Sequence, residues 1–201
     1  MSIPQGASRK KPVSYKEAAR QLLHPLVRLL SAMRVRPDAL TVLGWALSTG
    51  AATLFGLGLV KTAGLVMLLA GLFDALDGAV ARESDRTSAF GAFLDSTLDR
   101  LSEATVFVGI IFFYASASRP YEALVAGIAM AFSLGTSYAR ARAEGLGLRC
   151  EVGLLERAGR VGILSVFALA GLLTVGVALV AAGALITTAQ RILHVSHATH
   201  D

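Results

Sequence analysis

Four aspartates, grouped in two pairs, stand close together in the middle of the chain. Asp74 and Asp77 are three residues apart, and Asp95 and Asp99 are four residues apart. Because an α-helix turns about 100° per residue, each pair would share one helix face. If the chain folds back at the polar segment 83–86, the two acidic faces can meet. Clustered carboxylates repel one another and lose hydration, and a pair of divalent cations, which prefer oxygen ligands, would compensate them.

A different interpretation treats these acids as solvated charges at helix ends, or pairs them with Arg82, Arg86 and Arg100. Charged runs are usually of this kind. Here, however, apolar sequence leads into the acidic region and out of it again. Ionisable residues in membrane-like segments usually serve a function. The pattern therefore favours a site for two divalent cations, Mg²⁺ or Mn²⁺.

The rest of the chain must hold these carboxylates at one end of a bundle of membrane-spanning helices. Hydrophobic residues make up 54% of the 201 residues and charged residues only 16%, unlike a soluble domain. The apolar residues form runs close to the ~20 residues that cross a bilayer, and the third and fifth runs carry charges that a hydropathy count would penalise. We predict an all-α integral membrane protein with six transmembrane helices. The six runs are Leu40–Val60, Thr62–Ala81, Ala89–Ala115, Tyr121–Ala139, Leu154–Leu173 and Val177–Ile192.

The segment before these spans divides into two parts. Residues 1–12 are polar, and we expect a disordered N-terminus. In residues 13–35, leucines recur at helical spacing among basic residues. This predicts an amphipathic helix that lies in the membrane interface or packs against the bundle, with a kink at Pro25. The six-helix domain is expected over residues 36–195, followed by a solvated tail at 196–201.

The basic residues predict how the protein is oriented. Six spans put both termini on one side of the membrane, and that side holds all of the 19 Lys and Arg residues except Lys61 and Arg119. Because basic residues accumulate on the cytoplasmic side, both termini and the aspartates are expected to face the cytoplasm at the cell membrane. The net charge of +5 is then a consequence of topology, and no nucleic-acid partner is expected.

The spacing around the aspartates also resembles a known family signature. From residue 74 to residue 99 the chain matches all eight fixed positions of Asp-x2-Asp-Gly-x2-Ala-Arg-x8-Gly-x3-Asp-x3-Asp. This pattern resembles that of the CDP-alcohol phosphotransferase family, integral membrane enzymes of phospholipid synthesis. The resemblance implies an enzyme that transfers a phosphatidyl or archaetidyl group from CDP-diacylglycerol or CDP-archaeol to an alcohol and releases CMP.

The resemblance implies roles for individual residues. The aspartates would bind the two cations, and Asp99 would also take the proton of the acceptor hydroxyl. Pro37 suits the first turn of a helix, Gly78 leaves room for a ligand beside the backbone, and Arg82 suits a diphosphate. The residues implied for the CDP-lipid site are Pro37, Asp38, Ala39, Leu40, Asp77, Gly78, Arg82, Ser88 and Gly91.

Three later segments narrow the acceptor. Residues 137–144, 156–160 and 190–195 contain Ser-Tyr-x-Arg-Ala-Arg-Ala-Glu, Glu-Arg-x-x-Arg and Gln-Arg-x-x-His-Val. These resemble the branch of the family that makes phosphatidylinositol phosphate or its archaetidyl counterpart, in which a serine and three arginines bind the phosphate of myo-inositol 1-phosphate. The corresponding residues of this chain are Ser137, Arg142, Arg157 and Arg191.

Other functions stay open on the sequence alone. Glycerol 3-phosphate as the acceptor would keep the chemistry and change the arginine pocket. A polyprenyl transferase also uses acidic motifs with Mg²⁺ in membranes, but it usually has more spans and lacks the Gly-x2-Ala-Arg element. A transporter could use intramembrane acids to bind ions. A homodimer is expected by analogy with the family alone.

Overall fold

The computed structural model describes residues 15–84 and 86–200 of the chain, and within these residues it is helical with no strand. The all-α prediction is therefore confirmed, whereas the predicted disorder of residues 1–12 concerns residues outside the described part. The helices are α1 (Tyr15–Ala32), α2 (Pro37–Gly56), α3 (Val60–Glu83), α4 (Ala89–Ser116), α5 (Pro120–Gly145), α6 (Arg157–Leu169) and α7 (Leu173–His200).

Short turns make α2 to α5 run alternately up and down the bundle. Gly58, between α2 and α3, has a φ of +77°, a left-handed conformation that glycine adopts without steric cost. Pro37 and Pro120 occupy the first turns of α2 and α5, where the missing N–H of proline removes no helical hydrogen bond. Ser88 caps α4, because its Oγ accepts a hydrogen bond of 2.9 Å from the backbone N–H of Gly91.

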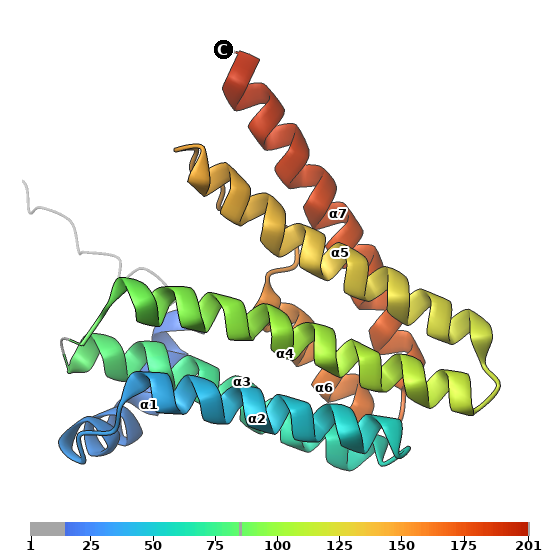
Figure 1. The fold of residues 1–201 in the computed structure, drawn as a ribbon, viewed down its shortest axis with the longest axis horizontal. Coiled ribbons are helices and arrows are strands. Elements are labelled where there is room, and N and C mark those ends of the chain that lie inside the picture. The colour runs from blue at the N-terminus through green and yellow to red at the C-terminus, as the bar shows by residue number, and fades with distance from the viewer. Residues whose placement is uncertain (1–14, 85, 201) are drawn as a thin grey trace, which may run out of the picture.

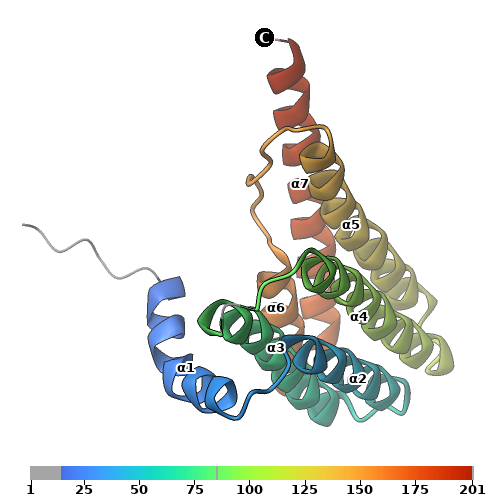
Figure 2. The same cartoon turned by 60° about the vertical axis from the view of Figure 1, so that its left-hand side comes forward.

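The helices form two groups joined by α4 and α6. Helix α2 packs against both α3 and α4, and α5 packs along α7 and against α4. The short helix α6 lies against α3 and α7, and α1 packs on α3. The C-terminal parts of α5 and α7 lean away from the layer formed by α2, α3 and α4 (Figures 1 and 2). As a result, the ends of α3 and α4 that carry the aspartates face the start of α6.

Small residues let the helix backbones approach closely. A Cβ atom at Gly109 of α4 would clash with the backbone of Ala52 in α2. A Cβ atom at Gly64 of α3 would lie 2.8 Å from the Cβ of Ala168 in α6. Close approach at small residues is typical of membrane bundles, where lipid supplies no hydrophobic driving force between helices. These contacts fix the distances from α2 to α4 and from α3 to α6.

Within the described residues, four helices are long and apolar enough to cross a membrane, namely α2, α3, α5 and α7 (residues 173–199). The chain is accordingly a multi-pass membrane protein. The two remaining predicted spans correspond to α4, whose first half carries the acidic motif, and α6, whose 13 residues extend about 20 Å. These are the third and fifth apolar runs, which carry the charges that a hydropathy count penalises. The count of six spans stays a prediction.

The two ends of the chain differ in extent from the predicted elements. Helix α1 lies within the predicted amphipathic segment 13–35, and Val27 is buried together with Leu76 and Val80 of α3. Leu29 of α1 and Met33, which follows the helix directly, are exposed, so one face packs on the bundle while apolar side chains remain outside. At the other end, α7 continues through residues 196–200, which were predicted as a tail.

We predict that Gly109→Ala lowers the thermal stability of the detergent-solubilised protein, because the new methyl group forces α2 and α4 apart. Overpacking of this kind costs about 1–3 kcal/mol. The matched control is Gly127→Ala in α5, where nothing lies within 4 Å of the added Cβ and the better helix former should be neutral or stabilising. Equal unfolding temperatures for the two variants would contradict the close packing of α2 on α4.

Candidate active site

The acidic motif lies at the end of the bundle where α3 finishes and α4 begins. Carboxylate oxygens of Asp74, Asp95 and Asp99 all lie within 4.8 Å of one another, and the three side chains are partly buried. The two acidic helix faces therefore meet, as their spacing predicts. The Ser88 cap fixes the start of α4 beside the end of α3, and this turn is what brings the two faces together.

Asp77, the fourth aspartate, is held by hydrogen bonds on both of its oxygens. Its side chain is buried, Oδ2 accepts a hydrogen bond of 2.7 Å from Thr41 Oγ1, and Oδ1 accepts one of 2.5 Å from the backbone N–H of Gly78. Thr41 lies in the second turn of α2. Asp77 therefore fixes the start of α2 against the acidic motif, and it stands outside the group formed by the other three aspartates.

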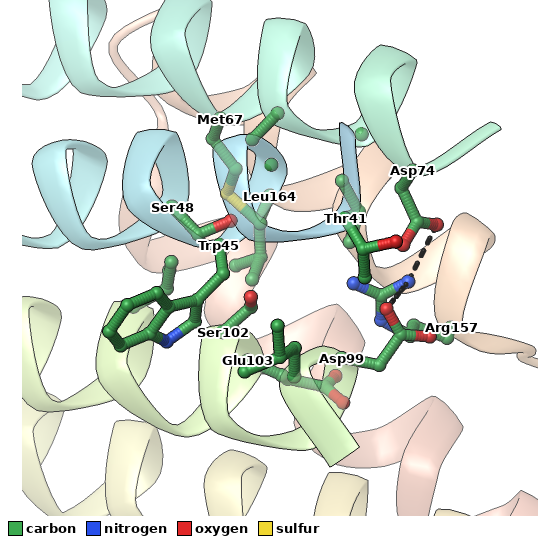
Figure 3. A pocket seen from close by; sticks show the side chains of 16 residues that line it. Thr41, Trp45, Ser48, Met67, Asp74, Asp99, Ser102, Glu103, Arg157 and Leu164 are labelled. Atoms are coloured by element: carbon green, nitrogen blue, oxygen red, sulfur yellow. Dashed lines mark hydrogen bonds and ion pairs between the residues drawn. The ribbon is translucent and has the colours of Figure 1, made fainter. Parts of the chain in front are cut away.

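Arg157, at the start of α6, contacts the aspartate cluster directly. Its Nη1 lies 2.7 Å from Asp74 Oδ2 and 2.8 Å from Asp99 Oδ1, and Figure 3 shows the guanidinium between these two carboxylates. Its Nε is buried and has no hydrogen-bond partner in the described part of the chain. The sequence analysis predicts that Arg157 binds the phosphate of the acceptor. In the structure its guanidinium lies directly against the aspartate cluster.

The cluster fits a divalent cation of the hard type. Its donors are carboxylate oxygens from two helices, which is the ligand set that Mg²⁺ and Mn²⁺ prefer over nitrogen or sulfur. The Arg157 guanidinium contacts two of the three carboxylates, those of Asp74 and Asp99, so negative charge remains to be compensated. The structure thus supports divalent metal binding by Asp74, Asp95 and Asp99.

A cavity of about 180 Å³ opens beside the cluster, between the start of α2, the end of α3 and the start of α4. Every residue predicted for the CDP-lipid site lines it except Ala39 and Leu40, and Leu40 is buried in a small apolar core. A Cβ atom at Gly91 would lie 3.2 Å from Asp38 Oδ1, so glycine allows α2 to approach the start of α4. The lining residues are Pro37, Asp38, Thr41, Asp77, Gly78, Ala81, Arg82, Arg86, Thr87, Ser88, Gly91, Ala92 and Asp95.

A second cleft runs from the other side of the cluster into the bundle. Asp74, Asp99 and Arg157 line its polar end, and Trp45 and Leu164 are among the side chains farther in (Figure 3). The cleft lies between α2, α3, α4 and α6. The aspartate cluster consequently separates a polar cavity, which Asp95 lines, from a largely apolar cleft, which Asp74 and Asp99 line.

The remaining residues predicted for the acceptor site lie farther from the cluster. Arg191 of α7 is buried, and it donates hydrogen bonds to the carbonyls of Val152 (2.9 Å) and Thr136 (2.6 Å). Ser137 follows Thr136 directly, so these two predicted residues are close. The side chain of Arg142 is exposed, 1.5 turns farther along α5.

The most buried ion pair among the described residues was missed by the sequence prediction. Arg160 and Glu103 are 1% and 6% exposed, and they form a double hydrogen bond between α6 and α4. Arg160 is the last residue of the Glu-Arg-x-x-Arg segment, and Glu103 follows Asp99 by four residues. A basic residue one turn after Arg157 was the available signal, but its partner on α4 could not be identified from spacing.

Comparison with protein families decides the class. The family profile described as CDP-alcohol phosphatidyltransferase matches residues 34–193, which span all the helices that build the site. The chain belongs to this family. It is therefore a phosphatidyltransferase of phospholipid synthesis, and the polyprenyl transferase and transporter interpretations fall away.

Two characterised relatives resemble this phosphatidyltransferase over most of its length. The archaetidylinositol phosphate synthase of Methanothermobacter thermautotrophicus is 41% identical over 137 residues, which cover 68% of this chain and 67% of that protein. The phosphatidylinositol phosphate synthase of Mycobacterium tuberculosis is 37% identical over 196 residues, which cover 91% of this chain and 89% of that protein.

Crystal structures of the mycobacterial synthase have the same fold as this phosphatidyltransferase. The structure with CDP-DAG bound superposes with a TM-score of 0.79 at 35% identity, covering 87% of this chain and 94% of that chain. The complex with manganese and citrate superposes with a TM-score of 0.77 at 36% identity, covering 85% and 87%.

We predict that the purified phosphatidyltransferase binds Mn²⁺ through the cluster, and that EDTA abolishes its activity while Mg²⁺ or Mn²⁺ restores it. Asp95→Asn should weaken Mn²⁺ binding, measured by electron paramagnetic resonance, because it removes one anionic ligand. Glu122→Gln, in the first turn of α5, serves as the control and should bind Mn²⁺ like the wild type. Full activity in chelator, or equal Mn²⁺ binding by both variants, would rule out the metal site.

Proposed function

We propose that this chain transfers the phosphatidyl or archaetidyl group of a CDP-lipid to the hydroxyl of myo-inositol 1-phosphate and releases CMP. The observation that carries the proposal is the position of the aspartate cluster between two cavities. The cavity lined by Asp95 contains the residues implied for the CDP-lipid, and the cleft lined by Asp99 contains Arg157. Two substrates could therefore meet at the same carboxylates.

The CDP-lipid would place its diphosphate in the cavity beside Asp95. Arg82 and Arg86 both line this cavity, and guanidinium groups match phosphate oxygens with paired hydrogen bonds. The start of α4 also borders it, and a helix N-terminus favours negative charge. Gly78 and Gly91 add no side chain to the cavity wall, and the Arg82 guanidinium lies beside Gly78, where it can contact a bound diphosphate. The mycobacterial relative has been crystallised with CDP-DAG bound, which supports a CDP-lipid as the donor substrate.

Asp74, Asp77, Asp95 and Asp99 would hold two divalent cations, Mg²⁺ or Mn²⁺. When bound, the ions would neutralise the diphosphate and stabilise the charge on the departing CMP. Asp77 would also keep α2 in place through its hydrogen bond with Thr41. The mycobacterial relative has been crystallised in complex with manganese, which supports a divalent metal as cofactor, and the oxygen-only donor set is consistent with either ion.

Asp99 would act as the general base. It lies at the polar end of the cleft, where its carboxylate contacts Arg157 and no described backbone donor. In the proposed reaction Asp99 accepts the proton of the inositol phosphate hydroxyl, whose oxygen attacks the phosphorus that carries the lipid. The bond from that phosphorus to CMP breaks, and CMP leaves with the negative charge.

The acceptor phosphate would be bound by Ser137, Arg142, Arg157 and Arg191. Arg157 brings an unpartnered, buried Nε to the site, and Arg142 is exposed, so both have donors for a ligand. A phosphomonoester carries up to two negative charges, which an uncharged alcohol would not bring to these arginines. The names of the characterised relatives favour inositol phosphate over glycerol 3-phosphate as the acceptor.

The membrane placement completes the proposal. We propose six crossings, formed by α2 to α7, with α1 in the interface and with both termini and the site facing the cytoplasm at the cell membrane. The basic residues near the site support this orientation, since Lys61 and Arg119 lie near the opposite ends of the helices. A homodimer is proposed by analogy with the family.

We predict that Asp99→Asn lowers turnover about 10²–10⁴-fold, the usual effect of removing a general base, while CDP-lipid binding persists. Turnover is measured as CMP release from CDP-diacylglycerol, and binding by calorimetry in detergent. Glu144→Gln, an exposed acid on α5, should leave both unchanged. Near-normal turnover by Asp99→Asn would assign proton abstraction to another group.

A panel of acceptors tests the substrate. We expect myo-inositol 1-phosphate to be used in preference to glycerol 3-phosphate and to free inositol. Arg142→Ala and Arg191→Ala should each raise the KM for inositol phosphate about 10–100-fold, as expected for a lost hydrogen bond to a charged group, and should leave the KM for the CDP-lipid nearly unchanged. A preference for glycerol 3-phosphate would move the chain to the phosphatidylglycerophosphate branch.

A further inference from the structure

An ion pair joins α4 and α6 one helical turn deeper in the bundle than the aspartate cluster. Arg160 Nε lies 2.6 Å from Glu103 Oε1, and Arg160 Nη2 lies 2.8 Å from Glu103 Oε2. The remaining nitrogen, Nη1, donates to the carbonyl of Leu155 over 3.2 Å, and Nη2 also lies 3.5 Å from Ser137 Oγ. The Arg160 guanidinium therefore connects α6 to Glu103 of α4, to the backbone at Leu155 and to Ser137 of α5.

The pair forms the deep rung of a two-rung ladder between the same helices. Arg157 and Arg160 are three residues apart on α6, and Asp99 and Glu103 are four residues apart on α4. Side-chain exposure is 24% and 22% for the outer pair, Arg157 with Asp99, and 1% and 4% for the inner pair. The outer rung can exchange partners with water or a ligand, whereas the inner rung is almost fully buried, with Glu103 at the wall of the cleft.

Stability alone does not account for the inner rung. Removing two charges from water costs free energy that their attraction offsets only when the geometry is good, and well-packed apolar residues often serve as well. What a two-point arginine–carboxylate contact adds is geometric specificity. Helix α6 is short and packs along α3 and α7, so the inner rung sets its rotation and height relative to α4.

The positions of two residues of the proposed acceptor site depend on how α6 is oriented relative to α4. Arg157 lies one turn from Arg160 on α6, so fixing Arg160 fixes where the Arg157 side chain leaves the helix. Ser137 Oγ is within reach of Arg160 Nη2, and Arg100 Nη2 approaches the backbone carbonyl of Ser137 at 3.5 Å. The inner rung thus holds α4, α5 and α6 together directly below the point where the acceptor phosphate is expected.

We propose that Glu103 and Arg160 are positioning residues for the acceptor: the ion pair holds Arg157 and Ser137 where they bind the acceptor phosphate, without touching the substrate itself. This inference rests on the proposed function, because it assumes that Arg157 and Ser137 bind that phosphate. It implies that weakening the pair impairs acceptor binding much more than binding of the CDP-lipid or the metal.

Arg160→Lys and Glu103→Gln test the proposal in the full-length enzyme. Each removes the two-point contact, and each should raise the KM for myo-inositol 1-phosphate about tenfold or more while the KM for the CDP-lipid and Mn²⁺ binding change less than about twofold. The double variant should be little worse than either single variant, because the two residues act as one unit. Glu122→Gln, which breaks the exposed pair with Arg119 at the other end of the bundle, should leave every parameter unchanged.

A second double variant, Glu103→Met with Arg160→Met, separates positioning from folding. It should unfold at a temperature equal to or above that of the wild type, since no buried charge is left unpaired, and yet retain the raised acceptor KM. A wild-type acceptor KM in this variant, or equal losses of acceptor, CDP-lipid and Mn²⁺ binding in the single variants, would overturn the proposal.

These measurements distinguish a failure of the positioning proposal from a failure of the proposed function. If the wild-type enzyme prefers glycerol 3-phosphate, the proposed acceptor is wrong, and the same variants are measured with glycerol 3-phosphate. A selective rise in its KM would still support the positioning role, because both acceptors present a phosphomonoester. Unchanged KM values with the preferred acceptor would overturn the positioning role whichever acceptor that is.

Discussion

Electrostatic repulsion among the clustered carboxylates is the constraint around which the rest of the structure is arranged. Asp74, Asp95 and Asp99 are held within 4.8 Å at the end of an apolar bundle, where water screens charge less than in bulk solvent. In its ionised form, such a cluster requires cations beside it and helices that cannot move apart. Arg157 supplies one cation from α6, and the donor set has room for divalent ions. Divalent metal binding at the cluster is consistent with that imbalance, and the family match identifies the chain as a phosphatidyltransferase.

The packing of the bundle resists the repulsion from every side. The Ser88 cap fixes the start of α4 beside the end of α3, and the Thr41–Asp77 hydrogen bond ties α2 to the same point. Farther along the bundle, α2 and α4 approach so closely at Gly109 that no side chain fits between them. Because the helices are rigid along their length, these contacts also hold the aspartates in place. The site is therefore built on helices rather than on a long loop, which suits a reaction that depends on positioning.

The two cavities on either side of the cluster present different chemical groups. The polar cavity offers two arginines and helix N-termini to a diphosphate, and the cleft offers Arg157 and Asp99 beside an apolar interior. In the proposed function a lipid-bearing phosphorus lies at the boundary, with the acceptor hydroxyl on one side and CMP on the other. The Glu103–Arg160 pair closes the bundle just below this boundary, so α6 presents Arg157 to the reacting groups.

Local spacing of residue types was enough to predict the helices and the grouping of the aspartates. Helical periodicity placed Asp74 and Asp77 on one face and Asp95 and Asp99 on another, and the apolar runs indicated where the helices lie. The family resemblance implied the CDP-lipid residues in two separate segments, at the start of α2 and around the α3–α4 turn, and all but Ala39 and Leu40 line one cavity. The contacts of α6 could be read only from the tertiary structure, because its partners are distant along the chain. Arg160 and Glu103 are 57 residues apart, and Arg157 and Asp74 are 83 residues apart. Spacing cannot say which side chain faces which across such distances. That depends on how closely small residues let α3 and α6 approach, and on which buried charges can find a partner.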